Sequence, residues 1–416
     1  MSSVVPEGWI TSRIQEVVLK VIDNRGKTPP LSDSGYNLIE VACVRDDKQF
    51  LDYEKITKCV SEDTYQTWFR NGHPKVGDTI VPTVGSIGEF AFVRENRGCI
   101  AQNLVALRPS AVIEPLFLYF QCYSEVVQNN ISRILMGAVQ PSLRVPNFLE
   151  TSLLLPPLPE QKKIASILTS VDEVIENTQK QIDKLQDLKK ATMNELLTKG
   201  IGHTEFKDSE LGRIPASWEV IELSSLVNST RPITYGIVQT GEHIPYGIPC
   251  VRVVDIVQGK PILERMIRTT QQINDSYSRT VLQENDIMFA LRGNIGFVRK
   301  VQSFLRGANL TRGIALISNS EEITSDYLLY ALQSQVVRRQ IADGVNGSAL
   351  QEIPLGNLRT VRVPVPCKTE QTGISKVIAS LDKLIETSLL KLSQTQSLKK
   401  SLMQDLLTGK VRVTVN

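Results

Sequence analysis

The sequence predicts an α+β protein with a pseudo-twofold internal repeat, in which a globular α/β domain followed by a long helix is used twice. Short motifs recur at one offset of 210 residues: Glu160-Gln161 is matched by Glu370-Gln371, and Leu188-Lys189-Lys190 by Leu398-Lys399-Lys400. A fixed period indicates that one structural unit is repeated. The repeat suggests a function that needs two similar surfaces held at a fixed separation.

The first long helix is expected over residues 158–200, with a linker over 201–213. Apolar residues, Leu188 among them, follow helical spacing up to Leu196, and no glycine or proline interrupts Gln161 to Leu197. Prolines precede this stretch, and two glycines, at 200 and 202, end it. A heptad pattern predicts the residues that pair this helix with another: Ile164, Leu168, Val171, Ile175, Ile182 and Leu185.

The second long helix is expected over residues 367–410, after Pro364 and Pro366 and up to Gly409. Its predicted pairing residues are Ile374, Ile378, Leu381, Ile385 and Leu392. Each helix would be on the order of 55 Å long. An apolar stripe this narrow on a helix this long needs a helical partner, and the other copy is the obvious one.

Residues 1–157 and 214–366 are expected to form the two globular domains. Both contain short β-like runs broken by Gly, Pro, Asn and Asp. In each, one run leads into a glycine-rich turn, Val84-Gly85-Ser86-Ile87-Gly88 in the first domain and Arg292-Gly293-Asn294-Ile295-Gly296 in the second. The domains match poorly over their middle parts, which fits two readers of different ligands and equally fits ordinary drift of exposed loops.

Composition is that of an ordinary globular protein, with 41% hydrophobic and 22% charged residues and a net charge of +3. No apolar run reaches the roughly 18 residues that span a bilayer, and no leader follows Met1. We therefore expect a soluble cytoplasmic protein without a membrane partner. The six cysteines are scattered without metal-ligand spacing, so they are interpreted as reduced thiols and no metal site is expected.

The two basic residue types are segregated along the chain. Between Ile214 and Pro366 there are 13 Arg and 2 Lys, whereas Leu158 to Arg213 contains 8 Lys and 1 Arg. Arginine has a planar fork suited to phosphates and base edges, and lysine suits solvated helix faces. This favours recognition by the globules and scaffolding by the helices, although the ordinary preference of lysine for helices explains part of it.

No known catalytic or cofactor-binding motif is present, and no cofactor is expected. The sequence has no phosphate-binding loop of the type G-x-x-x-x-G-K-[ST] and no G-x-S-x-G, and its three histidines lie in no zinc-like arrangement. Several independent absences favour a binding protein over an enzyme.

Candidate nucleic-acid contacts lie in the loops and glycine turns of the globules. Flexible polar or basic loops and glycine turns suit phosphate and base contacts, but solvated loops and hairpin turns have the same composition. A glutamine that follows a glycine segment in each domain has the reach for adenine or simply closes a turn. The predicted contact residues are Arg25, Lys27, Ser86, Gln140, Arg231, Tyr235, Arg265, Arg268, Arg279, Arg292, Asn294 and Gln351.

Motifs at the helix boundaries give a resemblance that covers the whole chain. They are Leu155-Pro156-Pro157-Leu158-Pro159-Glu160-Gln161-Lys162-Lys163-Ile164, Leu196-Leu197-Thr198-x-Gly200, and Leu211-Gly212-x-Ile214-Pro215-x-x-Trp218. In this order they resemble the specificity subunit of type I restriction-modification systems. The second helix departs from the pattern, with Cys367 where the family usually has another proline.

The resemblance implies two target recognition domains, residues 1–157 and 214–366, each reading one half of a split site in double-stranded DNA. It implies that the two long helices pack antiparallel, set the spacing and dock methyltransferase subunits, which we expect to number two. Restriction endonuclease subunits would join through the complex, and this chain would itself be non-catalytic.

Two other functions remain open from the sequence. A coiled-coil scaffold would join protein partners without reading DNA, and specific, salt-sensitive binding to a split duplex site would separate it from a DNA reader. A free-standing DNA-modifying enzyme is disfavoured by the missing cofactor motif.

Overall fold

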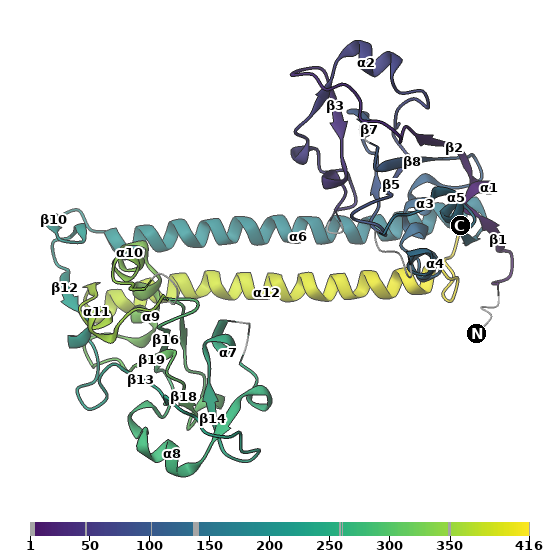
Figure 1. Ribbon diagram of the computed structural model, residues 1–416. Helices are drawn as coiled ribbons and strands as arrows, with labels where there is room; N and C mark the ends of the chain where they lie inside the picture. Colours follow the sequence, from purple (N-terminus) through teal and green to yellow (C-terminus); the bar gives the residue numbers. More distant parts are fainter. Residues whose placement is uncertain are drawn as a thin grey trace. The chain divides into compact units, whose positions relative to one another are not determined.

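The computed structural model describes residues 5–45, 48–100, 102–135, 141–257, 259, 261–347 and 351–415 (Figure 1). The chain forms two compact units. Unit 1 comprises Met1–Lys180 and Leu389–Asn416, and unit 2 comprises Gln181–Ser388. The two long helices, α6 (Leu158–Lys199) and α12 (Lys368–Leu406), therefore each contribute one segment to each unit.

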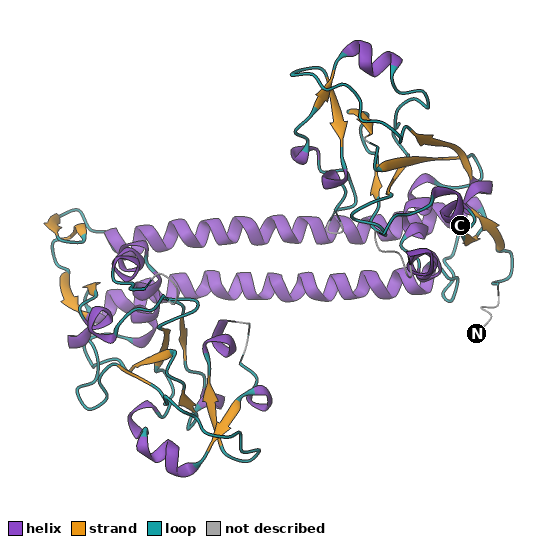
Figure 2. Ribbon diagram, in the orientation of Figure 1, coloured by secondary structure: helices purple, strands orange, loops and turns teal. Residues whose placement is uncertain are grey.

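Three sheets form the globule of unit 1, as the strands in Figure 2 show. The four-stranded antiparallel sheet has the order β2 (Val18–Asp23), β8 (Leu104–Pro109), β5 (Thr79–Pro82), β6 (Ala91–Phe92). The three-stranded sheet has the order β4 (Cys59–Val60), β3 (Tyr36–Ile39), β7 (Gly98–Ile100), and β3 and β7 are parallel. A separate pair joins β1 (Ile10–Arg13) to β9 (Ser152–Leu155).

Short helices cover these sheets and close the core of unit 1. Phe90, Phe117, Phe120 and Phe148 are fully buried in it. The helices are α1 (Ile14–Val17), η1 (Val41–Cys43), η2 (Tyr53–Lys55), α2 (Glu62–Thr67), α3 (Pro115–Cys122), α4 (Glu125–Leu135) and α5 (Val145–Leu149).

Unit 2 repeats this strand plan. Its four-stranded sheet has the order β13 (Thr234–Tyr235), β19 (Ile314–Ile317), β16 (Ile287–Ala290), β17 (Val298–Lys300). Its three-stranded sheet has the order β15 (Ile267–Thr269), β14 (Ile248–Val251), β18 (Asn309–Leu310), again with a parallel pair, β14 and β18. Two-stranded pairs join β12 (Glu219–Glu222) to β20 (Arg362–Val365) and β10 (Phe206–Ser209) to β11 (Gly212–Pro215).

The helices of unit 2 follow the order of those in unit 1, with η5 and η6 in addition. Trp218, Tyr327 and Phe289 are the largest fully buried side chains of its core. The helices are η3 (Leu223–Ser225), α7 (Val253–Val257), η4 (Leu263–Arg265), α8 (Gln271–Ser276), η5 (Ser278–Thr280), η6 (Ser303–Leu305), α9 (Ser325–Gln333), α10 (Gln335–Asp343) and α11 (Leu355–Arg359).

Within each unit the segments of α6 and α12 run antiparallel. In unit 1 the first part of α6 meets the last part of α12, because Lys399 Nζ lies 2.6 Å from Asp172 Oδ1. In unit 2 the last part of α6 meets the first part of α12, where Lys189 forms an ion pair with Asp382. The α+β class expected from the sequence is confirmed.

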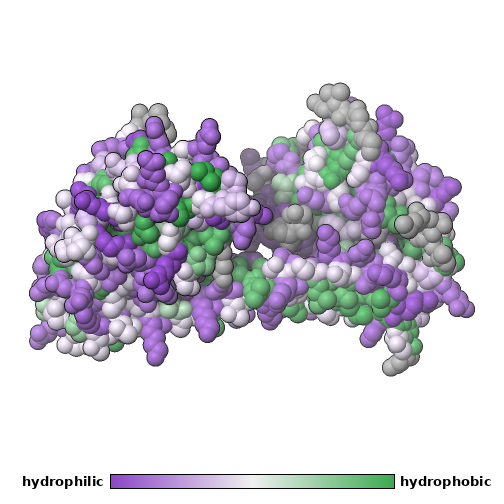
Figure 3. All heavy atoms as spheres, turned by 90° about the horizontal axis from the view of Figure 1, so that it is seen from below, coloured by the Kyte–Doolittle hydropathy of each residue, from purple (hydrophilic) through white to green (hydrophobic). Residues whose placement is uncertain are grey.

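Most residues predicted to pair the helices are covered. Ile164, Leu168, Ile182, Ile374, Ile378, Leu381 and Leu392 are buried, and Val171, Ile175, Leu185 and Ile385 are half-buried. Leu188 and Leu398, which the helical spacing placed with them, are 51% and 53% exposed. Both leucines therefore lie off the buried stripe. Figure 3 shows that, on the face it presents, apolar residues lie among hydrophilic ones.

The cysteines are all free, and only Cys367 is exposed. Among the described residues, no group of His, Cys, Asp and Glu has an arrangement that would hold a metal ion. Within the same part of the chain, none of the helices is both long enough and apolar enough to cross a membrane.

Candidate nucleic-acid interface

A buried carboxylate at the start of α6 ties the globule of unit 1 to its helix. Trp9 Nε1 donates to Glu160 Oε2 at 3.1 Å, and Arg412 Nε and Nη2 donate to the two carboxylate oxygens at 2.7 and 2.8 Å. Burial raises the pKa of Glu160, but the hydrogen bonds from Arg412 and Trp9 lower it further, so the net pKa is below its ordinary value. Glu160 is therefore held ionised as a fixed acceptor.

Unit 2 repeats this cluster at the start of α12. Trp218 Nε1 donates to Glu370 Oε2 at 3.0 Å, while His203 Nε2 and the Ile201 amide lie 2.8 and 2.9 Å from Oε1. The chain leaves the preceding helix through Gly200, whose φ of +67° and close approach to the Trp218 ring exclude a side chain. The equivalent Gly409 has a φ of +69° and packs on Trp9 in the same way.

The glutamine after each glutamate fixes the loops beside the helix. Gln161 accepts from the Glu114 amide at 2.8 Å and donates to the carbonyls of Val112 and Pro156 at 3.1 and 2.8 Å. Gln371 makes the same three bonds in unit 2, accepting from the amide of Thr324 and donating to the carbonyls of Glu322 and Pro366. The recurring Glu-Gln motif is thus the joint between globule and helix in both units.

The glycine turns are hairpin connections. The first links β5 to β6 and the second links β16 to β17, and all four glycines have positive φ values between +72° and +95°. The second glycine of each turn packs on a helix, Gly88 against Gln128 of α4 and Gly296 against Ile341 of α10. The hairpin alternative therefore describes their backbone, and Asn294 is an exposed side chain in the second turn.

Equivalent backbone hydrogen bonds hold a short segment beside each turn. The Thr83 amide donates to the Asn103 carbonyl, and the Leu291 amide to the Gly313 carbonyl, both at 2.8 Å. We call residues 102–103 and 312–313 the connectors, because they link β7 to β8 and β18 to β19. In unit 2 the turn also meets the segment that carries Gln351, through the bridge between Arg292 and Glu352.

Arg231, predicted to contact DNA, is occupied inside unit 2. Its guanidinium donates twice to Asp286 at 2.8 Å and also to the Val281 carbonyl, and its side chain is 14% exposed. In unit 1 Arg108 of β8 makes the same kind of two-point ion pair with Asp78, whereas Arg231 lies in the loop before β13. Arg231 therefore has a structural role, because its truncation would leave a buried carboxylate unpaired, and its contact with DNA stays a prediction.

Arg25 and Arg268 are also engaged within the protein. Arg25 makes a two-point ion pair with Asp23, at 2.8 and 2.6 Å. Arg268 donates to the carbonyls of Gly247 and Leu263 at 3.0 and 3.5 Å, which fixes the loops next to β14 and β15. A sequence cannot show these partners, and the contact of both arginines with DNA stays a prediction.

The remaining predicted contacts fall into three groups. Lys27, Arg265, Arg279, Asn294 and Gln351 are exposed, Tyr235 is 41% exposed, and Ser86 and Arg292 are half-buried. Gln140 lies outside the described residues. Their contact with DNA stays a prediction, and the turn and its bridge bring Arg292, Asn294 and Gln351 into one neighbourhood.

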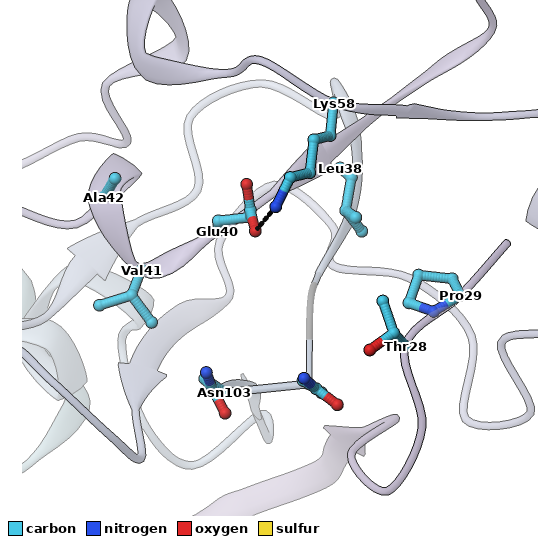
Figure 4. A pocket seen from close by; sticks show the side chains of 9 residues that line it. Thr28, Pro29, Leu38, Glu40, Val41, Ala42, Lys58 and Asn103 are labelled. Carbon is cyan, nitrogen blue, oxygen red and sulfur yellow. Dashed lines mark hydrogen bonds and ion pairs between the residues drawn. The ribbon is translucent and has the colours of Figure 1, made fainter. Parts of the chain in front are cut away.

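Unit 1 contains a cavity of about 400 Å³ beside its connector (Figure 4). Glu40 and Lys58 form an ion pair of 2.8 Å at one side of it, and Thr28 of the predicted basic loop contributes another wall. Sequence analysis missed the connector residues Gln102 and Asn103, which also line the cavity. In the sequence they are recognisable as two polar residues that follow a short apolar run. Gln102 stands 210 residues before Arg312 of unit 2.

Comparisons with known proteins agree with this two-part architecture. Residues 6–187 and 215–395 match the family model for the type I restriction modification DNA specificity domain. A Methanocaldococcus jannaschii protein assigned as the MjaX specificity subunit of a type I restriction enzyme is 29% identical and covers 98% of this chain and 95% of its own. The type I restriction enzyme MjaVIII specificity subunit of the same organism is 28% identical over 76% of this chain and 75% of its own.

Two solved structures share the fold along the full chain. One belongs to work on complex assembly and conformational transition of the type I R-M system, with a TM-score of 0.59, 16% identity, and coverage of 98% of this chain and 100% of that one. The other is the type I restriction-modification system S subunit from M. genitalium, with a TM-score of 0.57, 16% identity, and coverage of 100% and 98%. The matched residues and the repeated architecture place this chain in the family of type I restriction modification DNA specificity domain proteins.

Proposed function

We propose that this protein is the DNA specificity subunit of a type I restriction-modification complex. Each globule reads one half of a bipartite site in double-stranded DNA, and α6 and α12 set the spacing between the half-sites. The chain itself is non-catalytic and acts in the cytoplasm with methyltransferase subunits, which restriction endonuclease subunits join.

This proposal rests on one arrangement of elements and hydrogen bonds that occurs in both units, whereas the exposed side chains around it differ. The joint at each helix start, the hairpin turn and the connector recur with the same hydrogen bonds, whereas the loops around them carry different residues. Two domains with the same backbone arrangement and different exposed side chains can approach DNA in the same way and recognise two different half-sites.

Docking of two methyltransferase subunits is supported by an exposed apolar position that repeats on both helices. Val174 and Leu188 on α6 are 41% and 51% exposed, and Leu384 and Leu398 on α12 are 52% and 53% exposed. Each unit contains one of these residues from α6 and one from α12: Val174 and Leu398 in unit 1, and Leu188 and Leu384 in unit 2. The pairs are related by the offset of 210 residues, which fits two copies of one partner.

The test is to combine the full chain with its methyltransferase subunits and map methylation on a library of random duplexes. We expect two short half-sites with a fixed spacer, methylation only in the presence of the partner subunits, and binding that weakens steeply with salt. Methyl transfer by this chain alone, or partner assembly without any preference for DNA sequence, would contradict the proposal. The second result would favour a coiled-coil scaffold.

A further inference from the structure

The two units carry different side chains at one equivalent place, the connector. In unit 1 the connector consists of Gln102 and Asn103, and in unit 2 of Arg312 and Gly313. Both connectors follow the second strand of a parallel pair and are held by the same backbone hydrogen bond to the strand before the glycine turn. The backbone is therefore fixed, and the side chains are what differ.

In unit 1 the connector offers two neutral amides beside the cavity. Gln102 is half-buried, Asn103 is exposed, and within the described part of the chain neither carboxamide has a hydrogen-bond partner. The nearest charges are already paired with each other, since Lys58 Nζ lies 2.8 Å from Glu40 Oε1. A carboxylate in the wall disfavours a phosphate, so this site suits a neutral base edge.

In unit 2 the connector residue Arg312 and the turn residue Arg292 offer two guanidinium groups. Arg312 is exposed, and Arg292 packs across Gly313, where a Cβ would lie 3.2 Å from Arg292 Nε and 3.0 Å from a Val253 methyl group. Among the residues that the structure describes, neither guanidinium has a hydrogen-bond or ion-pair partner. At the position of Arg292, unit 1 has Val84, which is 42% exposed.

Gln and Asn are matched to adenine through its N6 and N7, and Arg is matched to guanine through its O6 and N7. We propose that the connectors are base-reading positions. Gln102 and Asn103 read an adenine in the half-site of unit 1, and Arg312, assisted by Arg292, reads a guanine in the half-site of unit 2. This inference rests on the proposed function and deepens it, because it assigns a base type to each reader.

The experiment compares methylation-site selection from a random duplex library by complexes that contain the full wild-type chain or a variant. The combined variant Gln102→Ala with Asn103→Ala should reduce discrimination at one adenine of one half-site about 10- to 100-fold, and leave the other half-site and the spacer unchanged. Arg312→Ala should do the same at one guanine of the other half-site. Arg306→Ala is the matched control, because this exposed arginine precedes β18, whereas Arg312 follows it.

The outcomes separate this inference from the proposed function. A wild-type complex without any bipartite preference would overturn the proposed function itself. A bipartite preference that the connector variants leave unchanged, or weaken equally on all sequences, would overturn the base-reading role alone. Thermal unfolding of each variant at the wild-type temperature establishes that a changed preference reflects lost contacts and not a lost fold.

Discussion

The joints at the two helix starts use the same buried groups but different closing groups. In both joints a tryptophan indole donates to the glutamate at the start of one long helix. A glycine that follows the end of the other long helix packs beside them. Arg412 of the C-terminal segment closes the joint in unit 1, and His203 of the linker closes it in unit 2. The difference teaches that the buried carboxylate, indole and amide define the joint, whereas the side chain that covers the carboxylate differs between the units.

The largest expected effect tests whether the two joints are equivalent. Gln161→Ala and Gln371→Ala each remove three hydrogen bonds from a side chain that is at most 1% exposed. The carbonyls and the amide left unpaired should cost about 3 kcal/mol of stability in each unit. Hydrogen exchange measured by mass spectrometry should rise in residues 112–114 for the first variant and in 322–324 for the second. A large loss in one unit and none in the other would refute the equivalence, and the exposed Gln186→Ala is the control.

The second prediction separates the closing groups. Arg412→Ala removes two hydrogen bonds and a positive charge from Glu160, whose side chain is 4% exposed, and leaves it with Trp9 and the Val413 backbone, so it should destabilise unit 1 more than His203→Ala destabilises unit 2. His203→Ala leaves Glu370 with both the Trp218 indole and the Ile201 amide, and should cost about 1 kcal/mol. Urea unfolding followed by tryptophan fluorescence measures both losses. Equal losses of stability in the two variants would contradict the expected difference between the two closing groups.

A third prediction concerns the acceptors between the helices. Tyr330 donates to Asp382 Oδ2 at 2.9 Å in unit 2, whereas in unit 1 the equivalent residue is Phe120 and Asp172 Oδ2 has no partner among the described residues. Burial, opposed by Lys399, raises the pKa of Asp172. Tyr330→Phe should therefore cost about 1 kcal/mol and leave Asp382 with Lys189 as its remaining side-chain partner. An unchanged urea midpoint for unit 2 would show that the hydroxyl contributes nothing.

The smallest expected effect is the pH dependence that Glu160 contributes to the stability of unit 1. The pKa of Glu160 is lower in the folded state than its ordinary value of 4.5, so its contribution to stability is present above pH 4.5 and is lost as the pH falls through the folded pKa. The stability gap between the wild type and Glu160→Gln should therefore narrow as the pH falls below 4.5. A gap that stays constant or widens with acid would contradict the assigned direction.

The sequence predicted the positions of the long helices better than the partners of exposed side chains, for a physical reason. The repeat and the apolar spacing located both long helices within a few residues, since α6 begins at Leu158 and α12 at Lys368, one offset of 210 apart. Cys367 in place of a proline did not shift this start, because Gln371 binds the Pro366 carbonyl as Gln161 binds that of Pro156.

Side-chain partners distant in sequence could not be predicted. Arg231 appeared to be a free donor because Asp286, its partner, lies 55 residues away. Asn103 and Arg312 were missed because their equivalence depends on backbone bonds to the strands before the glycine turns. Periodicity reports which face of an element is buried, but it does not report which exposed cation is already paired.

The most direct test of the central claim lengthens both helices at the junction of the two units. Four helical residues inserted after Lys180 and after Ser388 would add about 6 Å along the axis, equivalent to nearly two base pairs of about 3.4 Å each. Because four residues form a stutter in a heptad pattern, part of that displacement should be lost. Site selection from a random duplex library should return the same bases in both half-sites with a spacer longer by one or two base pairs. An active complex with an unchanged spacer would contradict the claim that these helices set the distance between the two readers.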